Sequence, residues 1–183
     1  MDPVEPDPEA LVLKYLATVP TQLNALLSSN SFGREETAAR IFFAAVTALG
    51  DAGLVFLIET RRIIARVDPI VLWRQLRRLD GPIPDWLEEE IRFLLGRRHC
   101  FIGTVVEREY RPEDGRPPSL KAEVRHPKFG IFIQEDGQRK RYRARAGDEV
   151  IIVRTRARFV SSWNGKNIAL ARFIPADPRN THY

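Results

Sequence analysis

The sequence of 183 residues holds a single cysteine, Cys100, and only three histidines. One cysteine excludes an internal disulfide and any zinc site built from several cysteines. No Cys, Asp or Glu stands at a metal-ligand spacing from His126 or His182, so we expect no metal and no cofactor. His99 adjoins Cys100, but neighbouring side chains on a strand point to opposite faces, which argues against a catalytic dyad. No P-loop or dinucleotide fingerprint occurs, and we predict a protein that is not an enzyme.

The chain also lacks a long apolar run. Its most apolar segment, residues 41–58, is interrupted by Gly50-Asp51-Ala52-Gly53 and leaves no span of about 20 apolar residues for a bilayer. The first ten residues, MDPVEPDPEA, are acidic and proline-rich, unlike a signal peptide. We therefore expect no membrane segment. The expected location is cytoplasmic, which leaves association with a nucleoid open.

Positive charge is concentrated in the second half of the chain. Residues 1–99 hold 12 Lys and Arg against 14 Asp and Glu, a net charge of −2, whereas residues 100–183 hold 17 against 10, a net charge of +7. A polyanionic partner is therefore expected on the second half.

Helical patterns fill the first half. After a disordered tail at residues 1–8, caps and apolar repeats predict helices over about 9–18, 21–28 and 35–49. Residues 54–69 are rich in β-branched side chains and predict a hairpin. Three helices followed by a hairpin resemble a winged helix-turn-helix domain over residues 9–67, which implies a regulator that binds duplex DNA. Two further helices, over residues 68–98, are expected to link or support the two halves.

The third of these helices is predicted to expose Phe43, with Arg40 as the one cation beside it. A helix that enters a major groove needs more positive charge and more polar side chains to read bases. Protein contact is therefore the preferred interpretation of this half, with Phe43 as an anchor for a protein partner or for a second copy of the chain.

From residue 99 onward the pattern changes from helical to alternating. Short sequential strands without a covering helix predict a small β-barrel over residues 99–175, followed by a tail at 176–183. The fold class expected for the whole chain is α+β, with a helical, winged-helix-like N-terminal domain and an oligonucleotide-binding (OB)-like β-barrel. The strands are expected at residues 101–110, 119–126, 128–134, 139–145, 149–160 and 166–173.

Two dipeptides, Asp136-Gly137 and Asn164-Gly165, predict tight hairpins whose register can be counted. Counting from Asn164-Gly165 places Trp163 opposite Lys166 on the core side, where a ligand role stays open, and places Phe159 opposite Leu170. It also directs a first arginine row to an outer face, namely Arg154, Arg156 and Arg158. Counting from Asp136-Gly137 places Phe132 outward, among the cations Lys128, Arg139, Arg141 and Arg143.

The segment KFGIFIQEDG, residues 128–137, resembles the Lys-Gly-Phe-Gly-Phe-Ile motif of cold-shock domains and the Phe-Gly-x-Phe-Val strand of S1 domains. Residues 146–150 and 168–173 resemble the fourth and fifth strands of an S1 barrel. Both families are OB barrels that stack single-stranded bases on aromatic side chains. The resemblance implies that Phe132 stacks a base, that Lys128 flanks it and that Gly130 lets the base approach. Residues 138–143 are arginine-rich where the cold-shock pattern has a second aromatic strand.

We therefore predict a non-catalytic protein that binds single-stranded DNA or RNA on its second half. Bases would stack on Phe132, with a further one near Trp163 or Tyr110, while Lys166 and the arginine rows contact phosphate. Two alternatives stay open. One is a duplex-DNA regulator of transcription or replication that acts through the first half, and the other is an interaction scaffold whose barrel binds an acidic protein.

Overall fold

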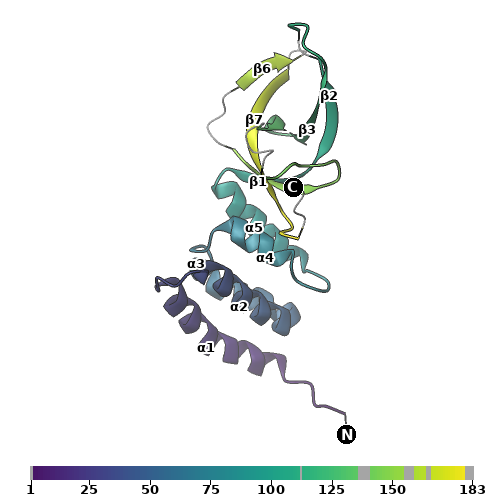
Figure 1. Ribbon diagram of the computed structural model, residues 1–183. Helices are drawn as coiled ribbons and strands as arrows, with labels where there is room; N and C mark the ends of the chain where they lie inside the picture. The colour runs from purple at the N-terminus through teal and green to yellow at the C-terminus, as the bar shows by residue number, and fades with distance from the viewer. Residues whose placement is uncertain (1, 112, 136–140, 155–158, 164–165, 180–183) are drawn as a thin grey trace. The chain divides into compact units, whose positions relative to one another are not determined.

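A computed structural model describes the backbone of residues 2–111, 113–135, 141–154, 159–163 and 166–179. The chain divides into two compact units, Met1–Leu94 and Leu95–Tyr183, which are described one at a time. Helices make up the first unit and a sheet makes up most of the second, so the expected α+β class is confirmed (Figure 1).

The helices begin where the capping signals predict. Asp7 caps the first helix, where its carboxylate accepts from the backbone N–H of Glu9 at 3.2 Å, and Asp68 caps the fourth by accepting from Ile70 at 2.9 Å. The two helices expected over 9–18 and 21–28 are in fact one continuous helix with Pro20 inside it. The elements are α1 (Pro8–Leu27), α2 (Arg34–Leu49), the 3-10 turn η1 (Gly50–Ala52), α3 (Gly53–Ile64), α4 (Pro69–Leu76) and α5 (Asp85–Arg97).

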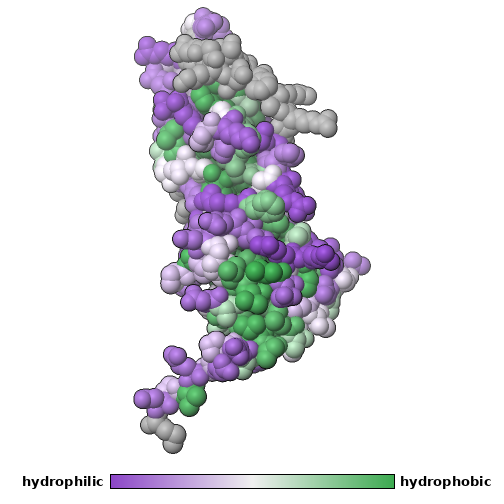
Figure 2. All heavy atoms as spheres, turned by 180° about the vertical axis from the view of Figure 1, so that it is seen from behind, coloured by the Kyte–Doolittle hydropathy of each residue, from purple (hydrophilic) through white to green (hydrophobic). Residues whose placement is uncertain are grey.

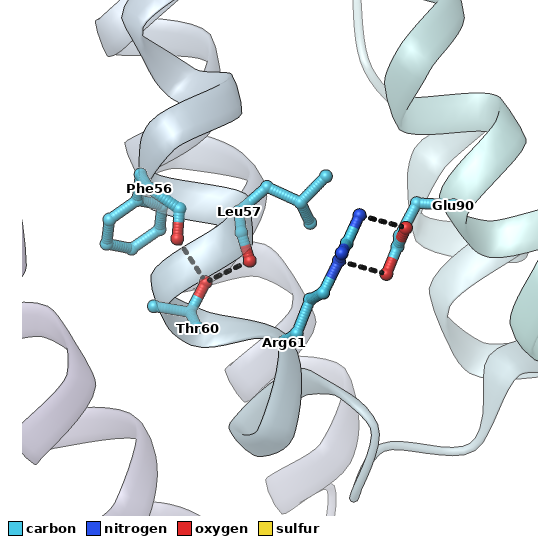
Figure 3. Close-up of polar contacts among 5 residues, drawn as sticks. All are labelled: Phe56, Leu57, Thr60, Arg61 and Glu90. Carbon is cyan, nitrogen blue, oxygen red and sulfur yellow. Dashed lines mark hydrogen bonds and ion pairs between the residues drawn. The ribbon is translucent and has the colours of Figure 1, made fainter.

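The hairpin expected over residues 54–69 is wrong, because most of this segment forms α3. Its buried side chains, among them Phe56, Thr60 and Ile64, recur at four-residue steps, and their burial outweighs the low helix propensity of β-branched residues. The Thr60 hydroxyl donates to the Phe56 carbonyl at 2.6 Å, and Arg61 forms two hydrogen bonds to Glu90 of α5, at 3.1 and 3.2 Å (Figure 3). The winged-helix resemblance depended on a wing here, and that support is lost.

The central helix of the first unit is α2, which contacts α1, α3 and α4. Because neighbours cover it on several sides, it buries more than one apolar stripe. Phe43, expected as an exposed anchor, is only 1% exposed and packs edge-on against Phe42 with 5.5 Å between ring centroids. The exposure predicted for Phe43 is therefore wrong.

Among the described residues, one helical stretch, Arg34–Ile64, is long and apolar enough to cross a membrane by length and composition alone. It consists of α2, η1 and α3, and Gly50 at the first junction has a left-handed φ of 57°. Of its most apolar window, 44% is buried inside the protein.

The second unit contains a seven-stranded sheet in which β4 pairs with β7 in parallel and every other described pair is antiparallel. The order is β1-β5-β7-β4-β3-β2, with β6 paired to β7. This order is an open path, so strand pairing alone does not close the expected barrel. The strands are β1 (Cys100–Thr104), β2 (Val106–Tyr110), β3 (Ser119–His126), β4 (Gly130–Gln134), β5 (Glu149–Val153), β6 (Phe159–Trp163) and β7 (Lys166–Pro175).

The strand expected over residues 139–145 is wrong for residues 141–145, which form a turn and irregular backbone, while 136–140, with the Asp136-Gly137 pair, lie outside the described residues. The buried side chain of Gln134 makes the hydrogen bonds to the backbone of residues 142 and 144 that a strand partner would have made. The Gln134 amide donates to the Tyr142 carbonyl at 2.7 Å and accepts from the Ala144 N–H at 3.1 Å. The Tyr142 hydroxyl in turn donates to Asp148 at 3.0 Å.

β4 and β7 turn toward the main core the face that was predicted to point outward, while Ile131, Ile133 and Ile168 of the predicted core side are buried as well. Phe132 points into the main core, whereas Leu170 is exposed. The count failed because β4 pairs with β3 and β7 rather than with residues 141–145. The other face carries a small second cluster of Ile131, Ile133 and Ile168. The main core includes Val124, Phe132, Tyr142, Val150, Ile152, Ala169, Ala171 and Phe173.

The register counted from Asn164-Gly165 is confirmed at its start and shifts further along. Trp163 pairs with Lys166 as predicted. A register shift between Phe159 and Ser161 then sets Phe159 opposite Ala169 rather than Leu170. Such a bulge inserts one extra residue, which the alternation of the sequence does not reveal.

Candidate functional site

Phe132, the residue predicted to stack a base, is not at the surface. It is 5% exposed and is paired in the sheet with Val124 of β3 and Ala169 of β7. The ring of Phe101 lies over it with 5.2 Å between centroids. A ring in this position cannot present a face to a base while the sheet is folded, so the prediction of an exposed Phe132 is wrong.

The exposed aromatic of this segment is Phe129, in the turn between β3 and β4, with 38% of its surface accessible. The turn is fixed by His126, whose Nδ1 accepts the backbone N–H groups of Lys128 at 3.1 Å and of Phe129 at 3.2 Å. Gly130, at the start of β4, has a φ of 97°, a conformation that favours glycine and lets the chain turn into the strand. The loop conformation of Phe129 is therefore determined by its own neighbours.

Three rings pack together at this place. The imidazole of His126 stacks on Phe129 with 4.4 Å between centroids and 20° between planes. Phe101 of β1 contacts both, at 4.6 Å from His126 and 6.0 Å from Phe129. Because Phe101 also rests on the buried Phe132, the exposed rings are supported by the core of the second unit.

Two cations lie against the exposed ring. The guanidinium carbon of Arg154 is 3.7 Å from the centroid of Phe129, and the Lys128 ammonium is 5.6 Å from it. Arg154 follows β5 directly, and its backbone N–H donates to the His99 carbonyl at 3.1 Å, which fixes its position beyond the strand. We call Phe101, His126, Lys128, Phe129 and Arg154 the aromatic–basic cluster.

The charge of this cluster comes from Lys128 and Arg154 rather than from the imidazole. Burial lowers the pKa of His126 below its usual range, and the nearby charges of Arg154 and Lys128 lower it further. The geometry agrees, since an Nδ1 atom that accepts two N–H groups carries no proton. At neutral pH the cluster therefore combines a neutral stack of rings with two positive charges.

A separate polar group lies around Glu123 of β3, whose side chain is fully buried. Its carboxylate accepts from the Tyr110 hydroxyl and from Arg125, and it pairs with Arg108 at 3.1 Å. Burial and the bond to Glu123 raise the pKa of Tyr110. Tyr110, considered as a second stacking residue, is partly buried, and its hydroxyl is held by this carboxylate.

The other predicted phosphate contacts divide into two groups. Arg141 and Arg143 are exposed, but they lie in a turn and in irregular backbone rather than in a strand row. Arg139, Arg156 and Arg158 lie outside the described residues, as do the side chains of Trp163 and Lys166. Of the cations predicted to contact phosphate, the structure thus brings Lys128 and Arg154 together at one aromatic ring.

Sequence reasoning missed Phe101, His126 and Phe129. A local signal did exist for two of them, since His126 and Phe129 flank Pro127-Lys128 just before Gly130, as in a short turn that ends in a glycine. Phe101 and Arg154 carry no such signal, because their contacts join segments far apart in the chain.

Comparison of the whole sequence with protein-family models and with curated proteins found no match, and comparison with solved structures found none either.

Proposed function

We propose that the second unit binds single-stranded DNA or RNA through the aromatic–basic cluster, without catalysing a reaction. The observation that carries this proposal is Phe129, an exposed ring fixed by its own turn and flanked by two cations. Single-stranded nucleic acids are bound by this combination, in which bases stack on aromatic side chains and phosphates lie near positive charge. The net charge of +7 on residues 100–183 supports a polyanionic ligand.

Arg154 has two parts in this mechanism. A base that approaches Phe129 meets the guanidinium plane of Arg154, which itself can stack on a base. When the base replaces Arg154 on the ring, the guanidinium is free to pair with the adjacent phosphate. Neither contact reads the identity of the base, so we expect binding that tolerates many sequences.

We further propose that the sheet closes as a small OB-like barrel. β1 and β2 stand at opposite ends of the strand order and are separated only by Val105. Counted as one bent strand, they give five main strands with β3, β4, β5 and β7, the number in an OB barrel. The near approach of Gly103 to Val124 supports closure, because a Cβ at Gly103 would lie 2.3 Å from a Val124 methyl group.

Fluorescence anisotropy with labelled single-stranded DNA and RNA oligonucleotides tests the proposal. Phe129→Ala should weaken binding by about 5- to 150-fold, the equivalent of one stacked base at about 1–3 kcal/mol, whereas Phe129→Tyr should keep most of it. Phe93→Ala, which removes an exposed ring from α5 in the first unit, is the matched control. Lys128→Ala and Arg154→Ala should each reduce the log–log salt slope by about 0.7.

Unchanged affinity in a folded Phe129→Ala protein would disprove the stacking role of this ring. The same titration separates the other two classes of function. Tighter binding of duplex than of single strands would favour a duplex-DNA regulator, and binding of an acidic protein in preference to either nucleic acid would favour a scaffold.

A further inference from the structure

The first unit has an exposed apolar face on α1 and α3. Leu13 of α1 is 68% exposed and Ile58 of α3 is 52% exposed, with Leu54 and Val55 exposed beside it. Figure 2 shows apolar side chains gathered on one side of this unit. Between the two helices the face is hollowed, and the hollow is lined by Pro8, Glu9, Val12, Leu13, Ala52 and Val55. Contiguous apolar surface of this kind marks an interaction site.

The two helices run in the same direction. Their first residues line the same hollow, and the rings of Tyr15 and Phe56 meet further along with 6.2 Å between centroids. Just past the end of α3, Arg66 donates to Asn24 near the end of α1 at 3.1 Å. The face therefore has one end where both helices begin and another where both approach their ends.

These two ends carry opposite charge. Glu9 in the first turn of α1 and Asp51 just before α3 are exposed at the starting end. Arg62 in the last turn of α3 and Arg66 just beyond it are exposed at the other end, together with Glu59, so that two cations stand there against one carboxylate. The face thus has an acidic end, an apolar middle and a basic end.

We propose that this face binds a second copy of the chain, with the two copies antiparallel about a twofold axis through the apolar middle. A twofold interface joins one patch to itself, so the patch must be complementary to itself. Antiparallel pairing meets this requirement, because the acidic end of each copy then lies opposite the basic end of the other. Parallel pairing would instead set like charges together.

The size of the face predicts the strength of the association. α1 has 20 residues and α3 has 12, so at about 1.5 Å per residue they are about 30 and 18 Å long. Side by side they cover about 500 Å² per copy, or about 1,000 Å² for the pair, at the low end of specific interfaces. We expect a reversible dimer with a dissociation constant on the order of micromolar.

Sedimentation velocity of the full chain over a range of micromolar concentrations is the direct measurement. Val55→Glu should give a monomer, since the twofold axis brings two buried carboxylates near each other. Phe32→Glu adds the same charge at a fully exposed ring outside this face and should leave the dimer intact. Circular dichroism melts of both variants verify that the first unit stays folded.

Charge reversal tests the antiparallel arrangement itself. Asp51 and Arg62 stand at opposite ends of α3, and antiparallel pairing sets α3 of one copy along α3 of the other. Asp51→Arg and Arg62→Glu alone should each weaken the dimer about tenfold, because each turns two symmetry-related attractions into repulsions. Combined in one chain, they should restore the original affinity. The proposal is overturned if the full chain stays monomeric throughout, if Val55→Glu still dimerises, or if the double reversal is as weak as the single ones.

Discussion

The strongest test of the assigned sheet faces compares two neighbouring rings, Phe132 and Phe129. Phe132 is 5% exposed and packs among core residues of β3, β4 and β7, so Phe132→Ala should lower the free energy of unfolding of the second unit by about 3–5 kcal/mol. Phe129 is 38% exposed and contacts mainly His126 and Arg154, so Phe129→Ala should cost about 1 kcal/mol. Had Phe132 pointed outward, as the hairpin count predicts, the two costs would be reversed.

These magnitudes are separable by experiment. A domain of 60–100 residues loses about 4–8 °C of Tm per kcal/mol, so Phe132→Ala should lose at least about 12 °C and Phe129→Ala about 4–8 °C. Because the two units can unfold separately, hydrogen exchange of amides in β3, β4 and β7 should report on the second unit alone. Phe132→Leu, which keeps most of the buried volume, serves as a milder variant if the alanine protein does not fold. Equal losses for the two alanine variants, or a larger loss for Phe129→Ala, would refute the assigned faces.

Three further outcomes follow from single contacts of the second unit. Gly103→Ala should destabilise the unit by about 1–3 kcal/mol, because the added methyl group overlaps Val124. In a double-mutant cycle, Val124→Ala should relieve part of this cost. Additive losses would contradict the close approach of the two residues. Gln134→Leu leaves two buried backbone groups without their partner and should cost about 2–6 kcal/mol in urea unfolding, so a loss under about 1 kcal/mol would disagree with this pairing. The pKa of His126 is lowered on folding, so its contribution to stability is complete above about pH 6.5 and is lost as the pH falls below that value. His126→Asn, whose amide oxygen can accept the same N–H groups, should flatten this acid-side slope, and an unchanged slope would count against His126 as its origin.

The first unit shows which features local sequence signals can predict. The beginnings of α1 and α4 follow from their aspartate caps, and α2 ends at Gly50 as expected, because each of these signals acts within one helical turn. The hairpin prediction failed at residues 54–64 because the segment fits two periodicities, that of a strand and that of a helix. β-branched residues favour a strand locally, but the four-residue spacing of Phe56, Thr60 and Ile64 lets a helix bury all three.

The second unit shows how a nonlocal pairing decides many side chains at once. The side-chain period of a strand is two, so a shift of one residue turns every core residue outward. The count from Asp136-Gly137 assumed that residues 139–145 pair with β4, whereas β4 pairs with β3 and with β7, which is distant in sequence. Parallel pairing of β4 with β7 has no hairpin turn to signal it.

The candidate site could be predicted only in part for the same reason. Lys128 and Arg154 were expected to contact phosphate, each with a different arginine row of one basic face. The ring that both of them approach, Phe129, is supported by Phe101 of β1, which also contacts His126 and Phe132. No spacing within the sequence indicates that residues 101, 129 and 154 meet.

The Phe-Gly-x-Phe segment explains why the motif resemblance pointed to the wrong ring. Phe129 and Phe132 are three residues apart, and on a continuous strand an odd separation puts two side chains on opposite faces. The core opposite β4 offers space for a large ring, because β7 contributes the small side chains of Ala169 and Ala171 there. Phe132 fills this space, and the left-handed Gly130 leaves Phe129 in the turn. Stability and the proposed stacking therefore reside in different rings of one motif, which is why single substitutions can separate them.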